Sequence, residues 1–241
     1  MRAMTTTGTH RCRGRTGRSA LLGTVFCLLL AGCGLGPSAT FEEVLEPSVL
    51  PHQVWGRPDL RYSGRGPRVA ILSDDTLRVA EADVRRALAG YSLKVAAISG
   101  EGFTGGERSS VDPSVGMERI ARMYGEDAPR RVVVALGFHD LRRPGPDHMT
   151  LMGSANAVFD EFGEACVVGV TNITSPPLPD HRTVRARALN DLVEERSDRV
   201  VDWNAMVRQN PEFLSDDGFT PSPEGAEVLV HAVRLNVEAC V

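Results

Sequence analysis

The sequence predicts an α/β domain in which five parallel strands form the middle layer of a three-layer α/β/α sandwich. Short runs rich in β-branched residues alternate along the chain with longer stretches whose apolar residues repeat every three or four positions. This alternation is typical of right-handed βαβ units, which build a parallel sheet covered on both faces. The simplest strand order for such a chain is 2-1-3-4-5, the flavodoxin-like order.

Each element follows from its own residues. The strand candidates lie at residues 68–72, 93–98, 131–136, 166–171 and 199–201. Helical spacing of apolar residues covers 77–91, 117–124, 150–162, 184–192 and 223–240. Two helix starts have good capping pairs, Asp112 before Pro113 and Ser222 before Pro223.

Residues 1–32 are predicted to be a lipoprotein signal peptide. Five arginines precede an apolar run from Ala20 to Leu30, which is too short to span a membrane. The run ends in Leu-Ala-Gly-Cys, which resembles the bacterial lipobox, so the Cys33 thiol would carry a diacylglyceryl group. With a second acyl chain, palmitate for example, the anchor would be stable. We expect a protein held at the extracytoplasmic face of the cell membrane; the alternative is an ordinary export signal.

Charge and composition limit the possible partners of the mature chain and indicate where its folded domain begins. The full sequence has 27 Lys+Arg and 31 Asp+Glu, and the signal removes five arginines, so the mature balance is 22 minus 31, or −9. Nucleic acid is therefore not an expected partner. Residues 33–66, rich in Gly and Pro, are expected to be the acylated N-terminus and a tether with a lead-in, and 67–241 the folded domain.

Two cysteines remain in the mature chain besides Cys33. In an oxidising compartment a disulfide between Cys166 and Cys240 is plausible, and we predict one that joins the fourth strand to the last helix. The alternative is two separate buried thiols.

Polar residues and glycines follow the predicted strands and precede the last helix. Because ligands bind beyond the carboxyl ends of parallel strands, we expect these residues to line one cleft. They form four blocks: Ser73, Asp74, Asp75 and Thr76; Gly100; Gly137, Phe138, His139 and Asp140; and Asp217, Gly218, Phe219 and Thr220.

These four blocks, in this order, resemble those of the SGNH (GDSL-type) hydrolases. That family has Gly-Asp-Ser-Leu after the first strand, a glycine after the second, Gly-x-Asn-Asp after the third and Asp-x-x-His before the last helix. The resemblance runs from about Arg68 to Cys240 and implies an esterase fold that needs no cofactor or metal.

The departures from the family pattern decide the expected activity. Asp75 stands where the nucleophilic serine belongs, His139 replaces the asparagine that would donate to the oxyanion, and Thr220 replaces the base histidine. Asp217 matches the aspartate that orients the base, and Gly100 matches the glycine whose N–H helps bind the oxyanion. A hydroxyl without a proton acceptor is a poor nucleophile. A carboxylate at the position of the nucleophile also opposes the negative charge that develops on the substrate's oxygen.

We therefore expect a catalytically inactive member whose cleft binds an envelope glycan, an acylated polymer or a protein. One alternative is an active esterase that uses a rearranged pair, Ser73 with His139. Another is a divalent-cation site, because four aspartates and a histidine would converge on the cleft. A purely structural interpretation is also open, in which Asp74 and Asp75 cap a helix, Asp217 braces a turn and His139 is a partly buried histidine bonded to a carboxylate neighbour.

Overall fold

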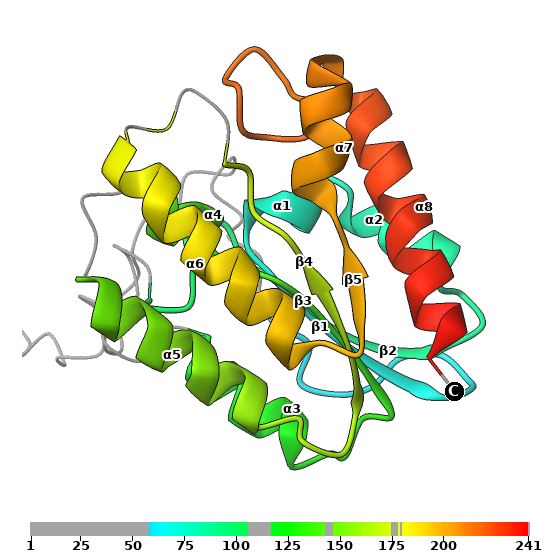
Figure 1. Ribbon diagram of the computed structural model, residues 1–241. Helices are drawn as coiled ribbons and strands as arrows, with labels where there is room; N and C mark the ends of the chain where they lie inside the picture. Colours follow the sequence, from blue (N-terminus) through cyan, green and yellow to red (C-terminus); the bar gives the residue numbers. More distant parts are fainter. Residues whose placement is uncertain (1–57, 106–116, 143–146, 175–177, 179, 241) are drawn as a thin grey trace, which may run out of the picture. The chain divides into compact units, whose positions relative to one another are not determined.

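The structure is a computed structural model that describes residues 58–105, 117–142, 147–174, 178 and 180–240 (Figure 1). The predicted signal peptide, Cys33 and the tether to residue 57 lie outside the described residues, as does the Asp112–Pro113 helix start. In the described part of the chain, no helix is long and apolar enough to cross a membrane.

Five parallel strands form one sheet in the order β2-β1-β3-β4-β5, which confirms the predicted fold class and strand order. Each predicted strand matches an observed one to within one residue at either end. The two central strands are buried on both faces over nearly their whole length, as a parallel sheet between helices requires. The strands are β1 (Arg68–Ser73), β2 (Ser92–Ala97), β3 (Arg131–Ala135), β4 (Cys166–Val170) and β5 (Arg199–Val201).

Helices cover both faces of the sheet (Figure 1). Alternate residues of β1 point to opposite faces: Val69 and Ile71 pack with α2, α7 and α8, whereas Ala70 and Leu72 pack with α3, α5 and α6. The helices are α1 (Asp75–Arg78), α2 (Glu81–Ala87), α3 (Glu118–Gly125), α4 (Phe138–Arg142), α5 (His148–Asp160), α6 (Asp180–Arg196), α7 (Trp203–Gln209) and α8 (Pro223–Ala239), with a 3-10 turn at Pro211–Phe213.

Three local features differ from the sequence expectation. The helix expected over residues 77–91 is two short helices, α1 and α2, which are separated by Val79 and Ala80. Helices α4 and α7 were not predicted, because each begins within three residues of a strand end and is too short to show a helical period. The predicted cap of α8 is confirmed, since Ser222 Oγ accepts from the Gly225 N–H at 3.1 Å.

Lead-in residues cover the open edge of β2. The backbone of Ser63 exchanges two hydrogen bonds with Leu93, at 2.8 and 2.7 Å, in an isolated antiparallel bridge. Asp59 adds two more to Val95, one from its backbone N–H and one to its carboxylate, both at 2.9 Å. An edge strand paired in this way is a poorer template for aggregation.

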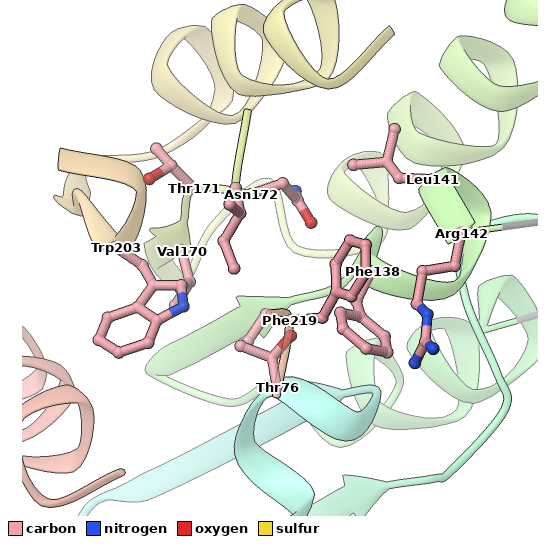
Figure 2. Close-up of a pocket in the computed structure, with 11 residues that line it drawn as sticks. Thr76, Phe138, Leu141, Arg142, Val170, Thr171, Asn172, Trp203 and Phe219 are labelled. Carbon is pink, nitrogen blue, oxygen red and sulfur yellow. The ribbon is translucent and has the colours of Figure 1, made fainter. Parts of the chain in front are cut away.

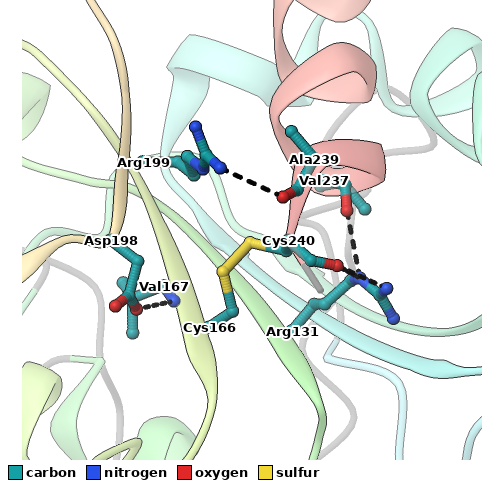
Figure 3. Close-up of a disulfide and its surroundings, with 8 residues drawn as sticks. All are labelled: Arg131, Cys166, Val167, Asp198, Arg199, Val237, Ala239 and Cys240. Carbon is teal, nitrogen blue, oxygen red and sulfur yellow. Dashed lines mark hydrogen bonds between the residues drawn. A yellow bond between two sulfur atoms is a disulfide. The ribbon is translucent and has the colours of Figure 1, made fainter.

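A disulfide between Cys166 and Cys240 joins β4 to the end of α8, with a Cα–Cα distance of 5.8 Å, and confirms the predicted bond (Figure 3). Arg131 Nε lies within hydrogen-bond distance of the Val237 carbonyl at 3.0 Å and of the Cys240 carbonyl at 2.9 Å. Arg199 donates to the Ala239 carbonyl at 3.3 Å. These guanidinium groups satisfy carbonyls that the helix end leaves without partners. The last helix is thus fixed at the amino ends of the strands, opposite the predicted cleft.

Candidate functional site

Three of the residues predicted for the site meet at the carboxyl ends of β1, β2 and β3. The His139 imidazole, on α4, is hydrogen-bonded through Nε2 to the carboxylate of Asp75. The backbone nitrogen of Gly100 lies 3.0 Å from the same Nε2 atom. The Ser99 hydroxyl and the Gly100 N–H also donate to Asp75. Sequence reasoning placed these residues at one edge of the sheet and allowed a carboxylate partner for His139, but it did not identify Asp75 as that partner.

Asp75 is an ionised carboxylate in a mostly enclosed position. Its side chain is 21% exposed and that of His139 is 15% exposed. Burial alone would raise the pKa of Asp75, but the hydrogen bonds from His139, Ser99 and Gly100 outweigh burial and lower it below its usual value. The position that the sequence resemblance assigns to the nucleophile therefore holds a negative charge.

Ser73 and His139 are not brought together. Ser73 is fully buried, and its hydroxyl accepts from the Leu77 N–H at 3.0 Å. The same hydroxyl faces two backbone carbonyls, those of Asp74 at 3.0 Å and Ala135 at 3.2 Å. Successive residues at the end of a strand point in different directions, and Ser73 points into the protein. The rearranged Ser73–His139 pair therefore has no support in this geometry.

Asp74 is a structural carboxylate beneath the cleft. Its Oδ1 accepts from the Thr76 N–H at 2.9 Å and from Thr76 Oγ1 at 2.7 Å, which caps α1. Its Oδ2 accepts from the Phe138 N–H at 2.8 Å, so the same side chain ties β1 to the start of α4. Complete burial raises the pKa of Asp74 to about 6, although the Thr76 hydrogen bonds favour the charged form.

Asp140 and Gly137 also serve the framework. The buried Asp140 carboxylate accepts from the N–H groups of Phe103 at 2.8 Å and Thr104 at 3.1 Å, which holds the loop after β2. Gly137 has a φ of +120°, and a Cβ there would lie 2.5 Å from Leu189 Cδ2. Both residues shape the wall of the site, and the buried Asp140 does not face a ligand.

Asp217 and Thr220 lie on an exposed turn before α8. The Asp217 carboxylate accepts from the N–H groups of Phe219 and Thr220, both at 2.8 Å, and from Thr220 Oγ1 at 2.7 Å. Burial would raise the pKa of Asp217, but the Thr220 hydrogen bonds and that of Phe219 outweigh it and lower the pKa. The turn-bracing role is therefore confirmed, and the contact runs between the two positions that the sequence resemblance assigns to the aspartate and the base.

The crowding of like charge that suggested a cation is relieved by hydrogen bonds. Asp74, Asp75, Asp140 and Asp217 each accept from their own set of donors. Within the described ranges, no three His, Cys, Asp or Glu side chains are grouped closely enough to hold a metal ion. The predicted convergence of four aspartates and a histidine is not observed, because the buried carboxylates turn toward backbone N–H groups.

A small apolar pocket with about 20 Å³ of free space opens beside the Asp75–His139 pair, and most of its residues were not foreseen as functional (Figure 2). Phe138 and Phe219 pack edge to face with ring centroids 6.0 Å apart. The Arg142 guanidinium lies over both rings, at 5.1 Å and 4.9 Å. Phe138 and Phe219 lie inside the predicted blocks, and Trp203 follows β5. Their positions after strands or before the last helix could have identified them from the sequence. The lining residues are Thr76, Ala135, Phe138, Leu141, Arg142, Val170, Thr171, Asn172, Ile173, Trp203 and Phe219.

A polar groove of about 480 Å³ adjoins the apolar pocket at the ends of β4 and β5. Thr171 lines both of them. The other groove residues come from α6, α7 and the segments after β4 and β5: Thr174, Arg187, Asn190, Asp191, Glu194, Asp202, Asn204 and Arg208. An apolar pocket and a polar groove therefore share one wall.

Comparison with protein-family models and with curated proteins finds no match for this sequence. Solved structures do match. A lipase/acylhydrolase from Enterococcus faecalis is 18% identical, with 72% of this chain and 96% of that chain covered and a TM-score of 0.57. A member of the lipolytic G-D-S-L family from Veillonella parvula gives 12% identity, 73% and 100% coverage and a TM-score of 0.55. The esterase EstA from Pseudoalteromonas sp. is 13% identical, with 72% of this chain and 98% of that chain covered and a TM-score of 0.54.

The domain has an SGNH hydrolase-like fold. The structural likeness and the strand order together confirm the resemblance drawn from the four blocks. At these identities the likeness establishes the fold alone, so the chemistry of the SGNH-like domain has to be argued from its own residues.

Proposed function

We propose that this chain is an envelope-anchored lipoprotein whose SGNH-like domain is non-catalytic and binds an acylated polymer of the cell envelope. The observation that carries the proposal is the pair of partners of His139. In the described residues, these partners are the Asp75 carboxylate and the Gly100 backbone N–H. Neither is a hydroxyl that an imidazole could activate.

The other corner of the family's site supports the same conclusion. Thr220 holds the position of the base, and a threonine hydroxyl does not accept a proton at neutral pH. Asp75 holds the position of the nucleophile, where its charge opposes the oxyanion that acyl transfer must stabilise, an effect normally worth about 3 kcal/mol per donor. The fold therefore keeps the cleft without the proton transfer that hydrolysis needs.

The choice of an acylated polymer rests on the two adjoining surfaces. The small apolar pocket, with Phe138, Trp203 and Phe219 among its walls, gives a short acyl group such as acetyl an apolar surface to contact. The groove beside it carries arginine, asparagine and carboxylate side chains that can hydrogen-bond a polar chain. A bare glycan would use the groove and leave the apolar pocket without a matching group.

The membrane anchor rests on the Leu-Ala-Gly-Cys sequence that ends at Cys33. In the native host, labelled palmitate should be incorporated into the wild type, and Cys33→Ser should abolish incorporation and release the protein from the membrane fraction. A Cys33→Ser protein that stayed in the membrane fraction would contradict the anchor.

The absence of catalysis is tested with a fluorophosphonate probe and an activated acetyl ester. We expect neither covalent labelling nor turnover above that of heat-denatured protein. Labelling of any serine in this domain, together with turnover that is lost when that serine becomes alanine, would overturn the proposal. The Asp75→Asn variant is assayed in parallel, because it removes the charge without supplying a nucleophile.

The ligand class is tested by calorimetry with an acetylated chitooligosaccharide and its deacetylated counterpart. We expect the acetylated oligomer to bind about fourfold more tightly, because one buried methyl group contributes about 0.8 kcal/mol. Phe219→Ala should remove this preference. Leu235→Ala, which alters an exposed residue on α8, is the matched control and should leave it unchanged. Equal binding of both oligomers would favour a glycan ligand, and binding of neither would contradict the proposal.

A further inference from the structure

The donors around Asp75 form a small anion-binding centre. The Ser99 hydroxyl and the Gly100 N–H come from the loop after β2, and the His139 imidazole comes from α4. Three donors from two separate elements thus converge on one carboxylate. Gly100 has a φ of +81°, a conformation that a residue with a side chain rarely adopts.

The hydrogen-bond chemistry fixes the direction of each contact. An imidazole nitrogen next to an ionised carboxylate carries a proton and donates it, so His139 Nε2 is a donor to Asp75. The Gly100 N–H points at the same Nε2 atom, at 3.0 Å, and also hydrogen-bonds the Asp75 carboxylate, so the imidazole and the carboxylate share it. All three groups are then donors directed at one negative charge.

Two of these donors stand where the family resemblance places the groups that bind an oxyanion. Gly100 matches the family's glycine, and His139 takes the place of its asparagine. In this chain, Gly100 and His139 instead hydrogen-bond the carboxylate of Asp75, which belongs to the protein itself. The enclosure is also suitable for an anion, since only 21% of the Asp75 side chain and 15% of the His139 side chain are exposed.

We infer that Asp75 is a built-in occupant of the anion-binding centre formed by Ser99, Gly100 and His139, and that it closes this centre to external carboxylates. Removing the Asp75 side chain leaves three enclosed donors without an acceptor, and a small monocarboxylate such as formate or acetate takes its place. The inference rests on the contacts of Asp75 and not on the proposed polymer ligand. A ligand of the native cleft must therefore reach the apolar pocket without placing its own carboxylate on this centre.

The test follows the melting temperature of the full mature protein, wild type and Asp75→Ala, during titration with sodium formate. For Asp75→Ala we expect a lower starting Tm and a saturable rise with formate, of about 5 °C or more at a hundred times the dissociation constant. Sodium chloride at equal ionic strength corrects for salt, and acetamide tests whether charge is required. The wild type should not respond beyond the salt correction.

Two variants serve as controls. Asp217→Ala also removes a carboxylate that accepts from three donors, but these belong to one exposed turn, so water replaces it and formate should have no effect. Asp75→Asn keeps the volume of the side chain in the centre and should also be insensitive to formate. A folded Asp75→Ala protein that does not respond would overturn the inference. So would a response shared by the wild type or by Asp217→Ala, because formate would then bind elsewhere.

If Asp75→Ala does not fold, the protonation of His139 in the wild type provides a second test of the inference. Nitrogen and proton NMR of the histidine rings should show a proton on His139 Nε2 at neutral pH, shifted downfield and slow to exchange because it is held by a carboxylate. An unprotonated Nε2 would mean that Gly100 donates to the imidazole, and the three-donor centre would not exist. The esterase and glycan experiments are independent of these results.

Discussion

The Thr220 hydroxyl donates a hydrogen bond to the carboxylate of Asp217, with 2.7 Å between Oγ1 and Oδ2. The family resemblance assigns this contact to a base histidine and the aspartate that orients it. The Asp217 carboxylate also accepts from the Phe219 and Thr220 N–H groups, so its direction is set by the turn and not by Thr220 Oγ1 alone. It is therefore already placed to orient a different side chain at residue 220.

We predict that the double change Asp75→Ser with Thr220→His yields measurable esterase activity. The first change supplies a hydroxyl and opens the anion-binding centre, and the second supplies a base that Asp217 can hold. Turnover of an activated acetyl ester should exceed that of either single variant by at least about tenfold, because residues that act as a unit are strongly non-additive.

The control for this experiment is Asp217→Asn in the same double variant. An asparagine favours the wrong imidazole tautomer, so most of the gained activity should be lost. A well-folded double variant with no activity would mean that residues 75 and 220 do not face each other across the cleft.

A second prediction concerns the pH dependence of stability. The pKa of Asp74 is about 6 in the folded protein, above its ordinary value of 3.8. Between these values, the folded state binds more protons than the unfolded state, so the contribution of Asp74 to stability falls as the pH rises from about 4 to about 6.

The Asp74→Asn variant isolates this contribution. It should be destabilised by about 2 kcal/mol, because its amide NH₂ cannot accept from both the Thr76 and the Phe138 N–H groups. Its deficit relative to the wild type should shrink as the pH rises from about 4 to about 6, as measured by urea unfolding at several pH values. A deficit that grew over this range would contradict a raised pKa.

A third prediction concerns the disulfide. Cys166 and Cys240 are 74 residues apart in sequence, so the bond restricts a long loop of the unfolded chain. Loop-closure entropy gives a stabilisation of about 4 kcal/mol for a loop of this length. Reduction, or the double change Cys166→Ser with Cys240→Ser, should lower the free energy of unfolding by about this amount. The double variant should not respond to reductant, whereas a wild type that did not respond either would show that the bond contributes little.

A fourth prediction compares two glycines in helices. A Cβ at Gly225, in the first turn of α8, would lie 2.0 Å from the Phe213 carbonyl oxygen, so Gly225→Ala should destabilise the domain by about 2 kcal/mol. A Cβ at Gly153, in α5, would meet nothing within 4 Å, so Gly153→Ala should stabilise by about 0.5–1 kcal/mol through helix propensity. Thermal unfolding of both variants measures the contrast. A neutral Gly225→Ala would mean that α8 can shift away from Phe213.

The sequence alone determined the strands, their order and the main helices. These features follow from periodicity and chain connectivity, because a β-branched run between two helical stretches has few ways to join a right-handed parallel sheet. For the same reason, the sequence placed Asp75, Gly100 and His139 at one edge of the sheet. The sequence left the bond between Cys166 and Cys240 open beside two separate thiols, and the Cα–Cα distance of 5.8 Å decided it.

Only the tertiary structure decided what each side chain at that edge does. Ser73 and Asp74 follow the same strand as Asp75, yet they are buried and bonded to the backbone, whereas Asp75 reaches His139. The direction of a side chain changes from one residue to the next at a strand end, and it depends on where α4 and the loop after β2 dock. The pocket between Phe138, Trp203 and Phe219 arises in the same way, because residues from three distant segments form a cavity only once the sheet and its helices have packed.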